Sequence, residues 1–162
     1  MTDRELNIAL REMARANGLC DTWYAEWSDD STIDECLDRY VRGFDFAQEK
    51  DYPPLDFIRK HFDKETLHRH NIYLDEEVIV MPDSGYWVFL GKCKARVRPY
   101  GYVAVSVYAR HESEVDVEAV MGAKVFVTYY DKAHGECWAD EYSSCKKYDR
   151  TYMDEGKVKS KK

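Results

Sequence analysis

Long apolar segments are missing from this 162-residue sequence. No run approaches the roughly 20 consecutive apolar residues that a membrane-spanning helix needs, so we expect no association with a membrane. The first residues, MTDRELNIALRE, are charged and amphipathic where a signal peptide would need an apolar centre. These two absences predict a cytoplasmic protein.

Cysteine is sparse, with five residues in the chain, and no two of them are spaced as CxxC. An odd number of scattered cysteines indicates reduced thiols in the core rather than disulfides or a zinc site. His61, His68 and His70 are the clustered histidines, but His70 cannot share a helical face with the other two. Because a metal site needs three or four converging ligands, we expect no metal and no cofactor.

Catalytic motifs are also missing. The chain contains no GxSxG, P-loop, GxGxxG or HExxH pattern. Adjacent carboxylates fall in expected loops without a recognisable acid–base partner, and Cys137 occupies an inward position of the repeat described below, where a thiol only packs. We therefore expect a protein that is not an enzyme. The open enzymatic alternative would need a pocket near His61, His68 and Glu76.

The net charge of −7 is unevenly distributed. Residues 1–80 hold 19 acidic and 10 basic residues, whereas residues 81–162 hold 12 acidic and 14 basic residues. Neither half has the basic surface typical of nucleic-acid-binding proteins, so we expect no direct nucleic-acid partner. The acidic half leaves one alternative function open: an inhibitor, encoded by a mobile element, that mimics nucleic acid and occupies a basic groove. The candidate residues of such a surface are Asp29, Asp30, Asp34 and Asp38.

The first 70 residues predict a bundle of short helices. Thr2 and Thr32 each precede a glutamate by three residues, which is a capping box, and apolar residues then recur at helical spacing. The expected helices cover residues 3–16, a short segment from Asp21, a long segment from Thr32 towards Tyr52, a segment after Pro54, and a last one from Asp63 through His70.

Residues 91–150 can be written as six consecutive blocks of ten. The third, fifth and seventh positions of each block are small or β-branched, as in Val103, Val105 and Val107, and the residues between them are mostly charged or aromatic. A period of two inside a period of ten predicts stacked strands in a repeat architecture. Two further strands are expected before the blocks, over residues 78–81 and 86–90.

Charged residues indicate how the blocks stack. If two blocks form one coil of about 20 residues, the first and third blocks become neighbouring parallel strands. The outward residues that would then lie side by side are Lys92, Lys94, Arg96 and Arg98 in one strand and Glu112, Glu114, Asp116 and Glu118 in the next. An antiparallel meander or a triangular coil would lose this complementarity. The fifth block fits less well, since Glu136 is expected to repel Asp116.

These patterns predict an α+β chain. We expect an N-terminal bundle of short helices over residues 1–76 and a charged, disordered tail over residues 151–162. Between them, residues 77–150 should form a C-terminal β-solenoid of parallel strands, with about 10 residues per strand-turn block and about 20 per coil. A solenoid has exposed edges that need covers. The helical half suits the first coil, and either a second copy or an aromatic cluster near Trp138, Tyr142 and Tyr148 suits the last.

Aromatic residues dominate the second outer face of the predicted solenoid. Exposed aromatic rows are candidate interaction surfaces, although the same residues could form cross-strand ladders or pack against the helices. The candidate residues are Tyr102, Tyr108, Phe126, Tyr142 and Tyr148, accompanied by Lys124 and Lys146. We therefore expect a non-enzymatic interaction or scaffold protein that uses the face or the end of the solenoid to bind a protein partner or another copy of itself.

Two stretches, GLCDTWYAEWSDDST and LDRYVRGFDFAQEKDYPPLDFIRKHFD, precede the V-x-V blocks and a YDKA sequence at residues 130–133. With these features the chain resembles, over nearly its whole length, a group of uncharacterised small proteins from gut-type bacteria and their phages or mobile elements. The resemblance implies a helical head followed by a β-solenoid, and it carries over no functional residue. More distantly, the blocks are similar to the short repeats of ice-nucleation-like and polymer-forming β-solenoids.

Overall fold

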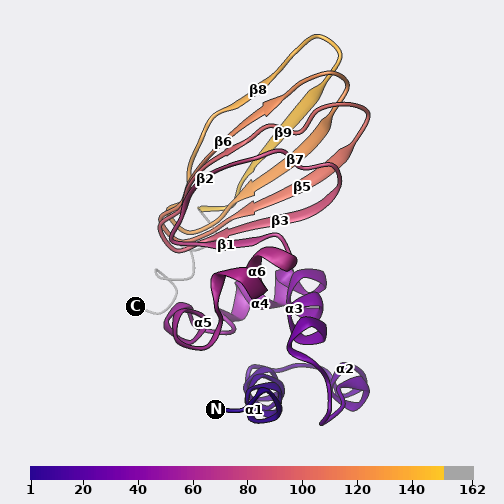
Figure 1. Cartoon of the computed structure of the whole chain (residues 1–162), viewed down its shortest axis with the longest axis vertical. Coiled ribbons are helices and arrows are strands. Elements are labelled where there is room, and N and C mark those ends of the chain that lie inside the picture. Colours follow the sequence, from indigo (N-terminus) through magenta and orange to yellow (C-terminus); the bar gives the residue numbers. More distant parts are fainter. Residues whose placement is uncertain (152–162) are drawn as a thin grey trace. The chain divides into compact units, whose positions relative to one another are not determined.

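The computed structural model describes residues 1–151, which form two compact units that separate between His70 and Asn71. Helices make up the first unit and parallel strands the second (Figure 1). The predicted α+β class, with N-terminal helices followed by a β-solenoid of about 20 residues per coil, is confirmed. The expected tail lies outside the described residues, apart from Thr151.

Six helices are present in the first unit. Their bounds are α1 Asp3–Ala16, α2 Asp21–Glu26, α3 Ile33–Arg42, α4 Phe44–Lys50, α5 Leu55–His61 and α6 Lys64–Arg69. The predicted caps are present, because the Thr2 and Thr32 hydroxyls each accept a hydrogen bond from the backbone N–H three residues later. The long helix expected from Thr32 is wrong in one respect: Gly43, at φ −100° and ψ 32°, divides it into α3 and α4.

A buried asparagine connects α1 to the segment after α2. The side chain of Asn7 is fully buried. Its amide Nδ2 donates hydrogen bonds to the carbonyl oxygens of Ser28 at 3.0 Å and Asp29 at 2.9 Å. Its Oδ1 accepts from Trp27 Nε1 at 2.7 Å and from the Cys36 thiol at 3.1 Å. All four hydrogen-bonding positions of the amide are used, so Asn7 fixes three separate parts of the helical unit.

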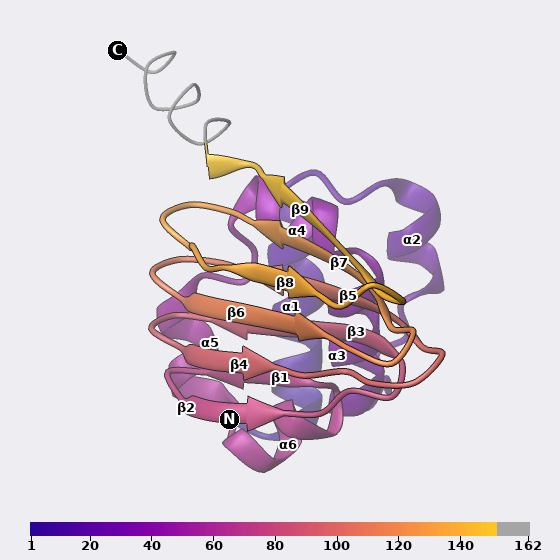
Figure 2. The same ribbon diagram turned by 90° about the horizontal axis from the view of Figure 1, so that it is seen from above.

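The second unit is a two-sheet solenoid. Its strands are β1 Ile72–Leu74, β2 Glu77–Val80, β3 Gly85–Leu90, β4 Lys94–Val97, β5 Ala104–Ala109, β6 Glu114–Ala119, β7 Lys124–Tyr129, β8 Cys137–Ala139 and β9 Ser144–Asp149. Odd-numbered strands form a five-stranded sheet in the order β1-β3-β5-β7-β9, and even-numbered strands form a four-stranded sheet in the order β2-β4-β6-β8. The chain alternates between the sheets, so each coil adds one strand to both (Figure 2).

The solenoid begins earlier than the predicted boundary at residues 76 and 77. Ile72 already pairs with Val88 in a parallel register, so β1 belongs to the five-stranded sheet. A three-residue strand is too short to show a period of two, and the pattern that predicted the other strands could not reveal it.

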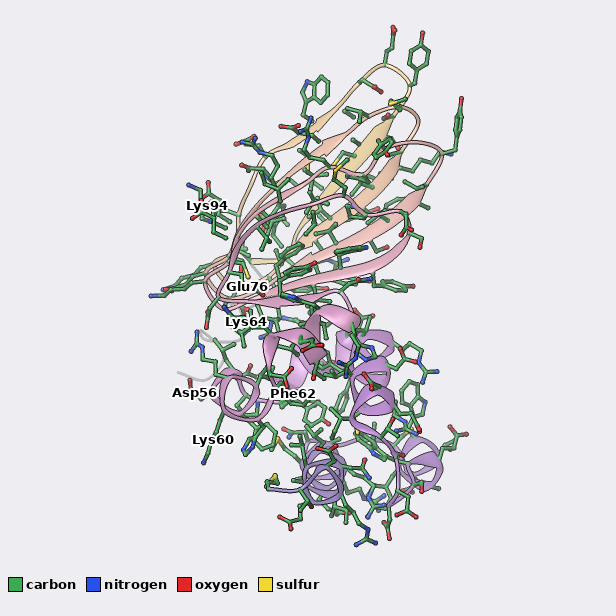
Figure 3. All side chains as sticks on the ribbon, viewed as in Figure 1. Asp56, Lys60, Phe62, Lys64, Glu76 and Lys94 are labelled. Atoms are coloured by element: carbon green, nitrogen blue, oxygen red, sulfur yellow. The ribbon has the colours of Figure 1, made fainter. Side chains whose placement is uncertain are left out.

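The predicted stacking of charged residues is confirmed. Lys94 pairs in register with Glu114, and Arg96 pairs with Asp116, in the neighbouring parallel strands β4 and β6. At the two ends of the row, Lys92 contacts Glu112 at 3.5 Å and Arg98 contacts Glu118 at 3.0 Å. Figure 3 shows Lys94 on the outside of the solenoid. The row therefore fixes the register of the four-stranded sheet, since a slip of one residue would reverse every side chain.

The row also extends in both directions beyond the prediction. Glu77 in β2 pairs with Lys94, so the alternation of charge begins one strand earlier. On the other side, the backbone N–H of Glu136 donates a hydrogen bond to Asp116 Oδ1 at 2.9 Å. Asp116 thus has a donor in the fifth block, where the sequence predicted only repulsion.

One corner of the coil, which follows β1, β3, β5 and β7, repeats a residue in the left-handed backbone conformation. Asp75, Gly91, His111 and Asp131 have φ values of 53°, 70°, 61° and 55°. Each turn is connected to the next. The Lys92 N–H donates to Asp75 Oδ1 at 2.8 Å, the Gly91 N–H donates to His111 Nδ1 at 3.0 Å, and the His111 N–H donates to Asp131 Oδ2 at 3.0 Å. Asn, Asp, His and Gly are the residues that tolerate this backbone conformation best.

Asp131 is also held by a buried arginine in this corner. Arg110 Nε lies 3.2 Å from Asp131 Oδ2, and the Arg110 side chain is only 5% exposed. Burial acts to raise the pKa of Asp131, but the charge of Arg110 and the hydrogen bond from His111 outweigh it and lower that pKa. Asp131 is therefore ionised and acts as the terminal acceptor of the corner ladder.

The interior of the solenoid is filled differently along its length. Valines at inward positions of β5, β6 and β7 are almost completely buried, as predicted. In the first coil, however, the inward ring of Tyr73 stacks on Trp87 at 6.1 Å and on Phe89 at 5.4 Å. In the last full coil Tyr129 is the largest fully buried side chain. The small inward residues thus fill only the middle of the solenoid, and aromatic rings fill both ends.

Candidate functional site

The structure brings together three of the five predicted aromatic residues. Tyr108 in β5, Phe126 in β7 and Tyr148 in β9 all lie on the outward side of the five-stranded sheet. Tyr148 and Tyr108 occupy the same row, separated by Thr128, and Phe126 lies in the adjacent row. The ring of Phe126 is 43% exposed and that of Tyr148 is 37% exposed.

The other two predicted residues lie elsewhere. Tyr102 and Tyr142 are in turns between the sheets, where they are 98% and 79% exposed. Both residues are second in their ten-residue blocks, and that position falls in the turn. Phe126 is sixth in its block and Tyr108 and Tyr148 are eighth in theirs, and these positions fall in the strand. Tyr102 and Tyr142 therefore do not belong to the row on the sheet.

Tyr86 in β3 joins the sheet residues, although the sequence did not indicate it. Its ring stacks on that of Tyr108 with centroids 6.1 Å apart and an interplanar angle of 8°, and it is 48% exposed. The spacing of 20 between Tyr86 and Ser106, which pair in register, was the available signal. We call Tyr86, Tyr108, Phe126 and Tyr148 the aromatic face.

Lysines accompany the aromatic face, and carboxylates do not. The outward positions of β5, β7 and β9 include Lys124 and Lys146 and no acidic residue. Lys146 is the register partner of Phe126, and neither lysine forms an ion pair with any residue in the range 1–151. The four-stranded sheet is different, because Lys94 and Arg96 have acidic register partners in β6 and ion pairs lie at both ends of that row. The aromatic face is therefore the outer surface whose lysines have no acidic register partner.

The last coil of the solenoid is closed by a lysine. Lys147 in β9 pairs in register with the buried Val127, so its side chain starts on the inward side. Its Nζ donates a hydrogen bond to the Gly135 carbonyl at 2.9 Å and lies 5.3 Å from the centroid of the Tyr129 ring. An inward-pointing charge on an edge strand is a common protection against edge-to-edge pairing. Lys147 thus opposes the addition of another strand at this end.

The aromatic cover expected for the last coil is not formed. Trp138 lies in β8 in register with the outward Glu118 and is 56% exposed, while Tyr142 is in a turn and Tyr148 belongs to the aromatic face. None of the three covers the interior of the coil, so Lys147 is the residue that crosses it.

Replacing Lys147 with valine is expected to cause self-association that increases with protein concentration, because it removes the inward charge from an edge strand whose backbone groups are unpaired. Sedimentation velocity over a hundredfold range of concentration measures this effect. Lys147→Arg keeps the charge and should sediment as the wild type does. Identical sedimentation of Lys147→Val and the wild type would show that Lys147 does not protect the end.

Two cysteines lie beside Lys147. All five cysteines of the chain are free thiols, and Cys137 and Cys145 are half-buried in the last coil. The hydrogen bond from the Cys145 thiol lowers the pKa of Cys137 against the effect of burial, with help from the charge of Lys147. The same hydrogen bond, together with burial, raises the pKa of Cys145. Cys137 therefore ionises before Cys145, and it is more polarised than the inert packing residue that its inward position predicted.

The predicted acidic surface is largely paired. Asp34 accepts from His70 Nε2 at 2.7 Å, and this bond, with the charge of Arg69, lowers the pKa of Asp34. The remaining ion pairs of the four acidic residues are Arg11–Asp29 at 2.5 Å, Arg4–Asp29 at 3.9 Å, Arg4–Asp30 at 3.6 Å, Arg69–Asp34 at 3.2 Å and His70–Asp38 at 3.8 Å. Basic neighbours reduce the negative potential that a mimic of nucleic acid would need.

The clustered histidines do not assemble a metal site. His70 is engaged by Asp34, and the ring of His61 packs on Phe57 with centroids 4.4 Å apart. Within residues 1–151, no group of three or more His, Cys, Asp or Glu side chains is placed to hold a metal ion.

In the same range, none of the helices is both long enough and apolar enough to cross a membrane.

These observations define a class: a chain with a helical N-terminal unit and a parallel β-solenoid whose two outer faces differ in chemistry. The architecture implied by the sequence resemblance is thus present. No family model, no curated protein sequence and no solved structure matches the chain.

Proposed function

We propose that the protein is a non-enzymatic interaction protein in which the solenoid is a rigid scaffold and the aromatic face binds another protein. The observation that supports this most directly is the exposure of Tyr86, Phe126 and Tyr148 on one sheet, next to two lysines without ion-pair partners. Tyrosine and phenylalanine supply large contact areas at a low cost in conformational entropy, and aromatic residues dominate the energetics of protein interfaces.

The chemistry of the face also indicates the chemistry of its partner. Lys124 and Lys146 would pair with carboxylates at the rim of an apolar groove, while the rings would enter the groove. Parallel strands held by the corner ladder present these side chains in fixed positions, so little ordering is needed on binding. The partner that fits is a protein with an apolar groove bordered by acidic residues.

Affinity capture with the full chain tests this proposal. We expect a protein partner to be captured by the wild type and lost when the face is changed by the double substitution Phe126→Ser with Tyr148→Ser. Removing two interface aromatics should weaken binding by about 30-fold or more, because one hot-spot residue contributes about 2 kcal/mol. Titration of the purified partner then gives the dissociation constants, and binding should weaken as salt rises.

A matched control uses the other sheet. Trp138→Ser removes an exposed aromatic residue from the outer side of the four-stranded sheet and should leave capture unchanged. A partner captured equally by the wild type and the double variant, or lost only with Trp138→Ser, would contradict binding at the aromatic face. Failure of both the wild type and the Trp138→Ser variant to capture any protein would also contradict it.

The alternative that the resemblance to mobile-element proteins suggests, an inhibitor with an acidic surface that mimics nucleic acid, has weaker support. Its four carboxylates contact arginine or histidine side chains, and Asp34 has two such neighbours. Salt-sensitive binding to a basic enzyme that is lost on neutralising Asp29 and Asp30, but not on changing the aromatic face, would favour that alternative.

A further inference from the structure

The helical unit contains an aromatic pocket that the proposed function does not use. The pocket has a volume of about 400 Å³, within the size range of small-molecule sites. It is formed by residues from the end of α1 through Tyr52. Ring-bearing side chains in its lining are Trp23, Trp27, Tyr40, Phe46 and Tyr52.

The polar groups of two of these rings already form hydrogen bonds within the helical unit. Trp27 Nε1 donates to Asn7 Oδ1 at 2.7 Å, and Tyr52 Oη donates to the Leu10 carbonyl at 2.9 Å. Both residues are only 6% exposed. They therefore present apolar ring surface to the pocket, which suits the body of an aromatic ligand.

One nitrogen of a guanidinium group in the lining lacks a hydrogen-bond partner among the described residues. Arg39 Nη1 is buried and donates no hydrogen bond to any residue that the structure describes. The guanidinium carbon lies 5.1 Å from the centroid of the Trp27 ring, so the group is held against the aromatic wall. Leaving a buried charged donor unsatisfied is costly, and a carboxylate is the group that satisfies an arginine best.

The other charged groups in the lining agree with an anionic ligand. Arg42 adds a second positive charge to the lining, against the single carboxylate of Asp45, and both of these side chains are exposed to solvent. A cationic ligand would meet two arginines and leave Arg39 Nη1 unsatisfied. A neutral apolar ligand would also leave it unsatisfied.

We propose that this pocket binds a small aromatic monocarboxylate, with its ring between the aromatic side chains and its carboxylate on Arg39. The site is independent of the aromatic face of the solenoid, and either proposal can fail without the other.

Three probes with the same phenyl body test the proposal on the full chain: 3-phenylpropanoate, 3-phenylpropanol and 3-phenylpropylamine. Calorimetric titration should give a dissociation constant for the acid at least about tenfold lower than for the alcohol, because a hydrogen bond to a charged group contributes about 1.5 to 3 kcal/mol. The amine should bind most weakly. In NMR spectra, the indole N–H signals of Trp23 and Trp27 should shift with the acid, while those of Trp87 and Trp138 in the solenoid should not.

Substitution of the arginine separates charge recognition from apolar binding. Arg39→Met keeps most of the side-chain length and should weaken acid binding about tenfold or more while leaving alcohol binding unchanged. Arg59→Met, which removes an arginine of α5 outside the pocket, should change neither.

Several outcomes would overturn the proposal. Equal affinity for acid and alcohol, shifts confined to other tryptophans, or no binding of the acid at millimolar concentration would each do so, as would unaltered acid binding by a folded Arg39→Met variant. If that variant loses its helical circular dichroism, the ranking of the three probes on the wild type decides the question.

Discussion

Replacing Gly135 with alanine is expected to unfold the last coils of the solenoid. A Cβ atom at this position would lie 1.8 Å from the Val115 carbonyl oxygen, 2.5 Å from the Val115 carbonyl carbon and 2.7 Å from Tyr129 Oη. Two of these atoms belong to the backbone of the neighbouring coil, which cannot move without breaking the ladder. We expect a loss of about 3 kcal/mol or more in the free energy of unfolding, above the usual effect of one added methyl group.

The clash arises because Gly135 and the side chain of Tyr129 both lie against the Val115 carbonyl inside the solenoid. The Tyr129 hydroxyl donates a hydrogen bond to the same Val115 carbonyl, and its ring is fully buried. Burial raises the pKa of Tyr129, so the hydroxyl stays protonated and keeps donating. A large residue in β7 therefore requires the smallest one in the fifth block.

Urea unfolding followed by far-ultraviolet circular dichroism measures the effect, and hydrogen exchange locates it in β6 to β8. Gly85→Ala is the matched control, because Gly85 has a φ of 82° but open space around its Cβ position. It should cost only the backbone penalty of about 1 to 2 kcal/mol. Equal urea midpoints for Gly135→Ala and Gly85→Ala would show that the contact of the new Cβ atom with Val115 does not destabilise the solenoid.

The register of the solenoid could be predicted because its information is local and repeated. Inward valines give the strand period, and one row of basic residues facing one row of acidic residues selects the two-block coil. Both signals depend only on spacing along the chain. The confirmed pairs of Lys94 with Glu114 and Arg96 with Asp116 follow from them.

The remaining features depend on contacts that spacing does not encode. The sequence could not show that Tyr102 and Tyr142 lie in turns while Tyr108 lies in a strand, because the ten-residue pattern does not show where each strand begins. Tyr86 was missed because β3 precedes the regular blocks. The role of Gly135 depends on Tyr129 and Val115, which lie in different coils.

The aromatic pocket of the helical unit was hidden for the same reason. Its lining comes from several helices and the segments between them, and no local pattern distinguishes Arg39 from the other arginines. Arg39 is identified only by its surroundings, because its Nη1 is buried and has no acceptor in the part of the chain that the structure describes.

Replacing Asn7 with aspartate is expected to destabilise the helical unit by about 3 to 5 kcal/mol at neutral pH, comparable to breaking a buried polar network. The amide donates to two carbonyl oxygens, of Ser28 and Asp29. A carboxylate has no proton for either, so both carbonyls would face a buried negative charge. Only the bonds that Oδ1 accepts, from Trp27 and Cys36, could remain.

The destabilisation should depend on pH in a defined direction. The buried position disfavours the charged carboxylate, so its pKa in the folded state should lie above the unfolded value of about 3.9. A group with a raised folded pKa contributes its stability below the unfolded pKa and loses it as pH rises through the folded pKa. Asn7→Asp should therefore be less destabilised at pH 4, where the protonated acid can donate to one carbonyl, than at pH 8.

Unfolding of the variant can be followed in its own unit by the fluorescence of Trp23 and Trp27, after Trp87 and Trp138 of the solenoid are replaced with phenylalanine. Asn17→Asp is the matched control, because the Asn17 amide donates one hydrogen bond, to the Met13 carbonyl at 2.8 Å, in a partly buried position. Water can replace that bond, so its loss should cost about 1 kcal/mol and vary little between pH 4 and pH 8. If Asn7→Asp behaves as Asn17→Asp does at both pH values, the four bonds of Asn7 do not hold the unit together, and packing between the helices does.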